Sequence, residues 1–274
     1  MQPGDAGDLD PKNFQSRRVK LLSAVTRRLI MWRGGLRISK LLIKLFGNSD
    51  PVEVEVLGFK MVLDPRDRMC LPLIYYPPLF EAGESAAFFP QIRPGDVVLD
   101  AGAHFGFYSL MAERCGAKVL SIEADPRTFR FLKYNLAANR STNVCAVQVG
   151  ISDRHETLQL FGNLELGDRS AHTFVPGSGR HDAIEVQCLP LAEILAANGF
   201  DRCDLLKMDV EGFEYRVLKP FLEQTKIRPR LILVEYYEHR NTGDVRALLQ
   251  EHGYRLERQI WANYVFTLAG KENP

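Results

Sequence analysis

The chain has 274 residues, of which 46% are hydrophobic, enough to bury the core of one large α/β domain or of two small ones. The net charge of +1 argues against a nucleic-acid partner and against a strongly acidic protein. Five cysteines without a C-x-x-C pair argue against a disulfide framework and a zinc site, and they favour a reducing compartment. We recognise no secretory signal or membrane span, and therefore expect a cytoplasmic protein, with the inner face of a membrane as an alternative location.

Basic residues are concentrated near the N-terminus. Residues 1–13 are rich in Gly, Asp and Pro and are expected to form a disordered tail. Residues 14–50 are called the basic arm here, because residues 11–49 hold ten Lys or Arg and no Asp or Glu. The pattern over residues 14–46 predicts amphipathic helices broken at Gly34-Gly35. This segment could make peripheral contact with an anionic membrane or, equally, pack on the rest of the protein with a solvated basic face.

The remaining chain reads as one catalytic domain with a covering segment. Residues 51–93 are predicted to form a hairpin, with strands at 52–56 and 60–63, and a helical cap. Residues 94–274 are predicted to form the core, in which apolar strands alternate with amphipathic helices as in βαβ units. The expected strands are 97–101, 118–123, 144–149, 204–209 and 231–236, and the expected helices are 107–115, 126–139, 190–198, 212–222 and 241–251.

Two departures from simple alternation help to define the fold. Strands at 254–260 and 263–268 have a minimal connection and must pair antiparallel. A β-excursion at 154–189 is expected to contribute to a substrate rim. Five parallel strands and a terminal antiparallel hairpin predict an α/β protein with the Rossmann-like class I methyltransferase fold, a seven-stranded mostly parallel sheet with helices on both faces. A dinucleotide dehydrogenase would normally add a sixth parallel strand.

The most specific motif is Val97-Val-Leu-Asp-Ala-Gly-Ala-His-Phe-Gly106, a strand followed by a glycine turn that opens a helix. Gly102 and Gly106 would let the backbone approach a ligand, and the N–H groups at the helix start would bind its carboxylate. Asp100 could receive an ammonium group, so the turn suits the amino-acid end of S-adenosylmethionine. His104 stands where a dinucleotide fingerprint needs glycine. The alternative is that the glycines serve packing alone.

A second acid completes this cofactor prediction. Glu123 ends the next strand, in Ser121-Ile-Glu-Ala-Asp-Pro126, and is expected to accept both ribose hydroxyls. Helix capping is the alternative role, which Asp125 fills better. Ser152 or Asp153 would meet the adenine edge, although a plain turn explains them nearly as well. The predicted cofactor contacts are Asp100, Gly102, His104, Phe105, Gly106, Phe107, Glu123, Ala124, Ser152, Asp153 and Asp209.

Charged residues also interrupt the strand within Asp204-Leu-Leu-Lys-Met-Asp-Val-Glu-Gly-Phe-Glu214. Lys207 and Asp209 share one strand face at the carboxyl edge of the sheet, where open α/β folds bind ligands. Such residues are costly in an apolar strand unless they are paired or used, so a buried salt bridge is the structural alternative to catalysis. Glu235 ends the fifth strand and should face the same crevice.

These residues form the predicted catalytic set, together with His239, a base at neutral pH. Lys207, if burial lowers its pKa, or His239 could take a proton, while Asp209 and Glu235 orient the acceptor or the base. His104 is a competing base. No metal is expected, because Asp209, Glu235 and His239 lack a diagnostic spacing.

The chain resembles the FkbM-type methyltransferase family from about residue 52 to 268. The resemblance is carried by Pro94-Gly-Asp-Val-Val-Leu-Asp-Ala-Gly-Ala-His-Phe-Gly-Phe-Tyr108, Ile122-Glu-Ala-Asp-Pro126, Asn135 with Asn139, Lys207-Met-Asp-Val-Glu-Gly-Phe-Glu214 and Val234-Glu235. His104 departs from the asparagine usual in such proteins. The resemblance implies O-methylation, by S-adenosylmethionine, of a hydroxyl on a sugar, glycolipid, polysaccharide or polyketide-type natural product.

The expected reaction is an in-line displacement with a hydroxylated small-molecule, glycan or lipid acceptor. An N-methyltransferase of protein or nucleic acid is an alternative, but the Asn/Asp-Pro-Pro-Tyr type of motif is absent after Lys207-Met208-Asp209. A non-catalytic binding protein with a methyltransferase fold is a further alternative. It is disfavoured because the cofactor acids and the crevice charges are all present.

Overall fold

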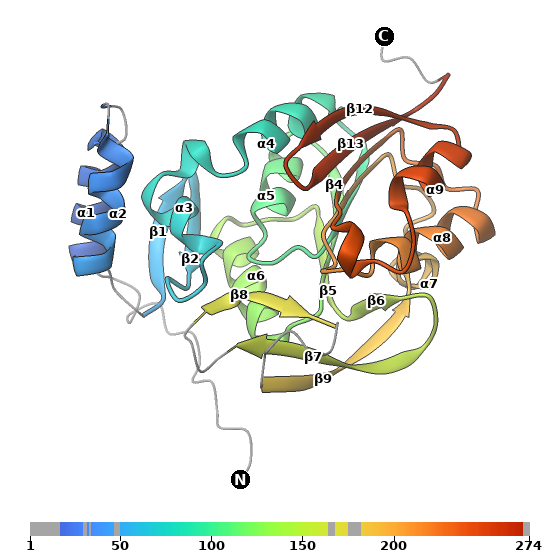
Figure 1. Ribbon diagram of the computed structural model, residues 1–274, viewed down its shortest axis with the longest axis horizontal. Coiled ribbons are helices and arrows are strands. Elements are labelled where there is room, and N and C mark those ends of the chain that lie inside the picture. Colours follow the sequence, from blue (N-terminus) through green and yellow to red (C-terminus); the bar gives the residue numbers. More distant parts are fainter. Residues whose placement is uncertain are drawn as a thin grey trace.

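The computed structural model describes residues 17–29, 32, 34–46, 50–163, 168–174 and 182–270. The predicted tail at residues 1–13 and two parts of the β-excursion, 164–167 and 175–181, lie outside the described residues. In Figure 1 the basic arm stands at one edge of the molecule, and the hairpin and a short helix lie between it and the main sheet. Within the described ranges, no helix is long and apolar enough to cross a membrane.

The N-terminal elements follow the sequence prediction. The basic arm contains α1 (Arg17–Leu29) and α2 (Gly35–Phe46), separated near Gly34 as expected. The predicted hairpin is formed by β1 (Val52–Val56) and β2 (Phe59–Leu63), which pair antiparallel. The covering segment continues through α3 (Cys70–Tyr75), η2 (Pro77–Leu79), α4 (Ala82–Phe88) and η3 (Phe89–Gln91).

The main sheet confirms the predicted fold. Its strand order is β12-β13-β11-β10-β3-β4-β5, with β3, β4, β5, β10 and β11 parallel and the β12–β13 hairpin antiparallel. The strands are β3 (Val97–Ala101), β4 (Lys118–Glu123), β5 (Val144–Gln148), β10 (Leu205–Met208), β11 (Leu231–Glu235), β12 (Tyr254–Ile260) and β13 (Asn263–Leu268). From β3 the chain adds β4 and β5 on one side, and it then returns to add β10 and β11 on the other side. The crevice between β3 and β10, at the carboxyl edge of the sheet, is the switch point where open α/β folds bind ligands.

Helices cover both faces of this sheet. One face carries α5 (Phe107–Arg114) and α6 (Pro126–Ala138), where Leu110 and Leu132 pack in a core that includes Val98 and Val119. The other face carries α7 (Leu191–Ala197), α8 (Glu214–Gln224) and α9 (Val245–Glu251), which pack on the alternate strand residues, including Leu99. Asp100 and Lys207 share the α5 face with Val98 because side chains alternate along a strand.

The β-excursion forms a separate four-stranded sheet in the order β6-β9-β7-β8. Its strands are β6 (Gly150–Ser152), β7 (Glu156–Asn163), β8 (Asp168–Thr173) and β9 (Asp182–Pro190). A small core around Leu160 and Val186 packs against Ala124 and Phe174. Since Ala124 directly follows β4, the second sheet lies beside the carboxyl edge of the main sheet, below it in Figure 1.

A buried amide fixes the covering segment to the core. Asn135 of α6 accepts a hydrogen bond from the Val62 N–H at 2.7 Å and donates to the carbonyl oxygens of Val62 and Phe105. Asn139 makes the equivalent pair of bonds with the backbone of Lys60. The two asparagines of the family resemblance therefore bind the free edge of β2 to α6, and Asn135 also holds the glycine turn after β3.

Candidate active site

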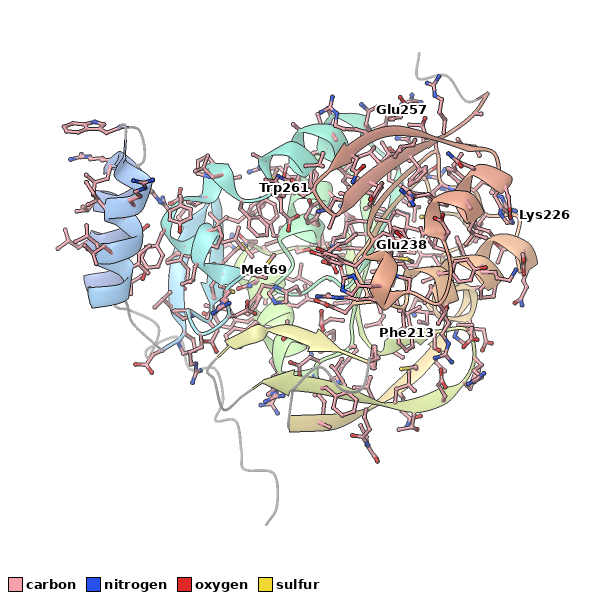
Figure 2. All side chains as sticks on the ribbon, in the orientation of Figure 1. Met69, Phe213, Lys226, Glu238, Glu257 and Trp261 are labelled. Atoms are coloured by element: carbon pink, nitrogen blue, oxygen red, sulfur yellow. The ribbon has the colours of Figure 1, made fainter. Side chains whose placement is uncertain are left out.

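A cavity of about 180 Å³ opens at the carboxyl ends of β3, β4, β10 and β11. One part of its wall is apolar and is formed by residues from the second sheet and the segment before it, including Ile151, Leu160 and Phe174. The opposite part holds charged side chains, which are Glu81, Lys207, Asp209, Glu211 and Glu235. Figure 2 shows how densely side chains fill the space between α3, near the labelled Met69, and this edge of the sheet.

The glycine turn is shaped by the protein's own packing. A Cβ on Gly102 would lie 1.9 Å from the carbonyl oxygen of Asp209, and a Cβ on Gly106 would lie 2.5 Å from Leu132 Cδ1. Both glycines have φ above +80°, a backbone conformation that disfavours other residues. Protein atoms therefore occupy the side on which a Cβ would stand, while Gly102 itself lines the cavity, and its approach to a ligand stays a prediction.

Most N–H groups of the turn are also used within the protein. Those of Gly102 and Ala103 donate to the Ile122 carbonyl oxygen, and that of Gly106 donates to Ala103. The His104 N–H donates to Glu123 Oε2 at 2.8 Å. The turn therefore offers fewer free donors to a carboxylate than the motif suggested, while Phe105 and Phe107 line the cavity with their side chains as predicted residues of the site.

Asp100 lies beneath the cavity and does not line it. Its side chain is buried, and Oδ2 accepts a hydrogen bond of 2.6 Å from Ser109 of α5. Oδ1 is buried without a hydrogen-bond partner. In the sheet register Asp100 stands opposite Lys207, whose charge opposes the rise that burial causes in the Asp100 pKa. The predicted direct contact with an ammonium group is therefore not supported, and Asp100 acts on the cavity through Lys207.

Glu123 stands at the end of β4 with its carboxylate held by the backbone. Oε2 accepts the His104 N–H, and Oε1 accepts the Asp125 N–H at 2.9 Å. Burial raises the pKa of Glu123. Asp125 caps α6 by accepting from the Arg127 N–H, so capping is the role of Asp125, as the sequence suggested. Glu123 and the next residue, Ala124, both line the cavity.

His104 is oriented by an acid that the sequence did not single out. Its backbone has φ 52°, in the left-handed region, where asparagine, aspartate and histidine are enriched among residues other than glycine. The ring Nε2 lies 2.8 Å from Oδ2 of the buried Asp67. Burial lowers the pKa of His104, but the adjacent carboxylate outweighs burial and raises it. A higher pKa favours the protonated ring, which cannot accept a further proton, and this weakens the case for His104 as a base.

Lys207 is the centre of the charged wall. Its Nζ donates to the Gly102 carbonyl oxygen at 3.2 Å and to Asp209 Oδ2 at 3.5 Å, and it stands 5.4 Å from the ring centroid of Tyr108. Burial alone would lower the pKa of Lys207, but Asp209, Asp100, Glu81 and Glu235 together raise it well above its ordinary value. The condition under which Lys207 could act as a base is therefore not met.

Asp209 and Glu235 face each other from neighbouring strand ends. Burial and the adjacent Asp209 charge raise the pKa of Glu235 to about 9. Asp209 Oδ1 is buried without a donor unless Glu235 carries a proton. Near neutral pH Glu235 therefore keeps its proton, which it can donate to Asp209 Oδ1.

Three carboxylates at this wall could also hold a cation. Asp209, Glu211 and Glu235 each offer an oxygen, and these oxygens lie within 4.8 Å of one another. Oxygen ligands of this kind suit Mg²⁺ or Ca²⁺. Glu211 is also engaged by Arg240, whose NH1 donates to it at 3.1 Å.

Glu81 and Tyr108 complete the wall and were not predicted. Tyr108 donates a hydrogen bond of 2.6 Å to Glu81 Oε2, and burial raises the Glu81 pKa. Phe80 packs edge-on against Phe107, with ring centroids 5.1 Å apart, so an aromatic layer shields this side. Glu81 comes from the covering segment and belongs to no motif. Its only local peculiarity is a left-handed φ of 41°, which sequence patterns do not reveal.

Besides Asp100 and Gly106, three more predicted site residues do not line the cavity. Ser152 and Asp153 belong to a polar cluster in which Asp153 accepts a hydrogen bond of 2.7 Å from Arg216. The apolar Ile151 lines the cavity in their place. His239 is exposed in η4 (Glu238–Arg240), with its ring 5.9 Å from that of Tyr237, and it does not line the cavity. The predicted roles of these three side chains are therefore not supported.

Comparisons with known proteins find relatives among methyltransferases. Residues 100–256 match the model of the methyltransferase FkbM domain. The chain is 31% identical over 204 residues to the methyltransferase sdnD of Sordaria araneosa, covering 62% of this chain and 79% of that protein. It is 29% identical over 195 residues to the 31-O-demethyl-FK506 methyltransferase FkbM of Streptomyces tacrolimicus, covering 60% and 74%. A precorrin-6y C5,15-methyltransferase structure from Geobacter metallireducens aligns with a TM-score of 0.42 and 12% identity over 69% of this chain and 86% of that one.

Proposed function

The chain belongs to the FkbM methyltransferase family, and from this premise we propose that it is an S-adenosylmethionine-dependent O-methyltransferase. The proposed acceptor is a hydroxyl on a sugar, glycolipid, polysaccharide or natural product. The observation that carries the proposal is that one cavity holds a carboxylate suited to a ribose, Glu123, together with a second carboxylate, Asp209, placed to receive a hydroxyl proton.

The residues present fit this methyl donor. S-adenosylmethionine would supply a methyl group activated by a sulfonium charge, carried on an adenosine and an amino-acid end. Each Glu123 oxygen accepts one backbone N–H and keeps a lone pair for a ribose hydroxyl. The apolar wall near Ile151 and Phe174 suits a planar base, and the carboxylates around Lys207 favour a cation.

Proton removal falls to Asp209 in this proposal. Lys207 and Glu235 hold their protons near neutral pH, so neither accepts another from the acceptor hydroxyl. Asp209 lies beside Lys207 and stands at the carboxyl edge of the sheet next to the glycine turn. The aromatic layer of Phe80 and Phe107 excludes water, and positioning supplies most of the acceleration.

Two observations favour a hydroxyl acceptor over an amine. A planar amine is usually met by an Asn/Asp-Pro-Pro-Tyr motif after this strand, whereas this chain continues from Asp209 with Val210-Glu211-Gly212. A hydroxyl needs a proton acceptor at the moment of transfer, and Asp209 in the cavity wall offers a carboxylate for that role. The name of one relative also specifies O-methyl chemistry on a natural product, and that chemistry supports the proposal by analogy.

The test combines cofactor binding with turnover. Calorimetric titration with S-adenosylmethionine should show micromolar binding that weakens about tenfold to a hundredfold in Glu123→Ala, since a hydrogen bond to a charged group is worth about 1.5–3 kcal/mol. In a screen of hydroxylated glycans and lipids, Asp209→Asn should lower turnover by about two to four orders of magnitude. Glu238→Ala removes a surface carboxylate outside the cavity and is the matched control (Figure 2).

Each contrary result has a distinct meaning. Absence of cofactor binding by the wild type would support a binding protein that keeps the fold. Unchanged affinity in Glu123→Ala would move the ribose site elsewhere. Methylation of amines alone would support the N-methyltransferase alternative.

A further inference from the structure

The basic arm packs on the catalytic domain through one stripe of each helix. On α1, Ser23 donates a hydrogen bond of 2.8 Å to the Ile74 carbonyl oxygen of α3, and Thr26 donates to that of Tyr75. Val19 is buried beside them. On α2, Ser39 is buried, and Leu42 packs against the same core. The arm is therefore a fixed layer over α3, which corresponds to the packed alternative considered for this segment.

The opposite stripe of each helix is exposed and apolar, which simple packing does not explain. Of the nine large hydrophobic side chains exposed in the described residues, five lie in this arm: Leu21, Val25, Trp32, Ile38 and Leu41. Leu21 is 69% exposed and Trp32 is 75% exposed. Leu21 and Val25 are four residues apart on α1, and Ile38 and Leu41 are three apart on α2, so each pair shares a helix face. A solvated face would be expected to carry polar residues instead.

The charge of the arm identifies the occupant of this face. Arg28 and Arg37 are exposed on the same stripes as the apolar residues. Residues 11–49 contain ten basic residues and no acidic one, while the remainder has nine more acidic than basic residues. Apolar side chains interleaved with cations fit an anionic lipid surface. A symmetric dimer through this face would bring two such basic patches together, and like charges disfavour it.

We propose that the outer face of the basic arm, formed by α1, α2 and Trp32, docks on an anionic lipid membrane. The helices have 13 and 12 residues, whereas a span needs about 20, so they would lie in the plane of the interface. The arm contacts α3, whose Leu73 lines the cavity. Docking therefore connects the lipid surface to the active-site wall through a single short helix.

The test is flotation of the full chain with vesicles. The wild type should float with phosphatidylcholine vesicles that contain phosphatidylglycerol, and much less with phosphatidylcholine alone. Arg28→Glu with Arg37→Glu should weaken binding by about tenfold or more, because each basic residue near an anionic surface contributes about fivefold and each introduced carboxylate is repelled by the lipid. Trp32→Ser with Leu41→Ser should weaken it by about tenfold or more by removing buried apolar area.

Matched surface substitutions control for non-specific effects. Trp261→Ser removes an exposed tryptophan between β12 and β13, and Lys226→Glu reverses an exposed charge at the other end of the molecule from the arm (Figure 2). Both should bind vesicles like the wild type, and all four variants should keep the wild-type Tm and cofactor affinity. This readout does not depend on methyl transfer, so it stands or falls separately from the proposed function.

Three results would overturn the proposal. They are no flotation of the wild type with anionic vesicles, equal flotation with neutral vesicles, and wild-type flotation in both arm variants. Sedimentation velocity adds a fourth, because a wild-type dimer that the arm substitutions dissociate, without lipid binding, would make this face an interface between copies of the chain.

Discussion

The two ends of the cavity hold their charges in different ways. At the ribose end, the Glu123 carboxylate receives two backbone N–H groups, whose positions are fixed by the strand and turn. At the acidic end, Asp209, Glu235 and Glu81 gather around the side chain of Lys207, and their charge depends on which of them carries a proton. The first end is therefore pre-organised by the backbone, whereas the second is set by titratable groups and responds to pH.

The largest effect should come from removing the cation at the acidic end. Lys207→Met leaves Asp100 and Asp209 as neighbouring carboxylates without their counter-charge, and breaking such a buried pair costs about 3–5 kcal/mol. Because burial raises the pKa of Asp100, the loss should grow as pH rises and this carboxylate ionises, and it should shrink as pH falls. Thermal unfolding at several pH values measures this. A drop of about 10 °C near pH 8 is expected for a protein of this size.

Lys118→Met is the matched control for that change, because Lys118 lies in β4 of the same sheet but is exposed. Its Tm should stay close to that of the wild type at every pH. A Lys207→Met protein with the wild-type Tm across the range would show that the carboxylates do not need this cation, and the contrast between the two ends of the cavity would fail.

An effect of opposite sign should follow from neutralising Glu235. Its pKa is raised from 4.5 to about 9, so the folded protein keeps a proton that the unfolded chain has lost, and stability falls as pH rises between those values. Glu235→Gln lacks this titration. Its Tm relative to the wild type should therefore increase from pH 5 to pH 9, by about 2–4 °C for each 1 kcal/mol of stability regained.

Calorimetry of both proteins across this range measures the difference, and Glu257→Gln, at an exposed position of β12, serves as the control. A difference in Tm that is constant with pH would mean that Glu235 is ionised throughout. In that case the proton would not be shared with Asp209, and another group would have to relieve the repulsion between them.

The sequence predicted those features of the fold and of the cavity that lie within single helices, strands or hairpins. Strands at 254–260 and 263–268 coincide with β12 and β13, because period-two patterns and a minimal connection determine a hairpin locally. Glu123 was found from its place at the end of a strand, a position that backbone topology fixes. The part of the cavity that is formed by the carboxyl ends of the parallel strands could therefore be predicted from the sequence.

What the sequence could not predict depends on tertiary contacts. Asp67 and Glu81 enter the site from the covering segment, whose docking on the core is fixed by Asn135 and by packing, and no local pattern encodes this. The rise in the Lys207 pKa requires several carboxylates from separate elements to meet, which reverses the effect expected from burial alone. Ser152 and Asp153 follow a strand as predicted, but Arg216 of α8 binds Asp153 away from the cavity.

The smallest expected effect concerns a divalent cation, and it tests how the acidic end is neutralised. Asp209, Glu211 and Glu235 could ligate a cation, but a proton on Glu235 and the charge of Lys207 already relieve their repulsion. We therefore expect methyl transfer to remain within about twofold of its original rate in excess EDTA, because no metal ligand is needed for Asp209 to accept a proton. Loss of activity that returns on adding Mg²⁺ would contradict this. If Mg²⁺ then raised the Tm of the wild type but not that of Glu211→Gln, the ion would be placed at these carboxylates. In that case the charge of the acidic end would be set by a bound metal and would no longer depend on a proton.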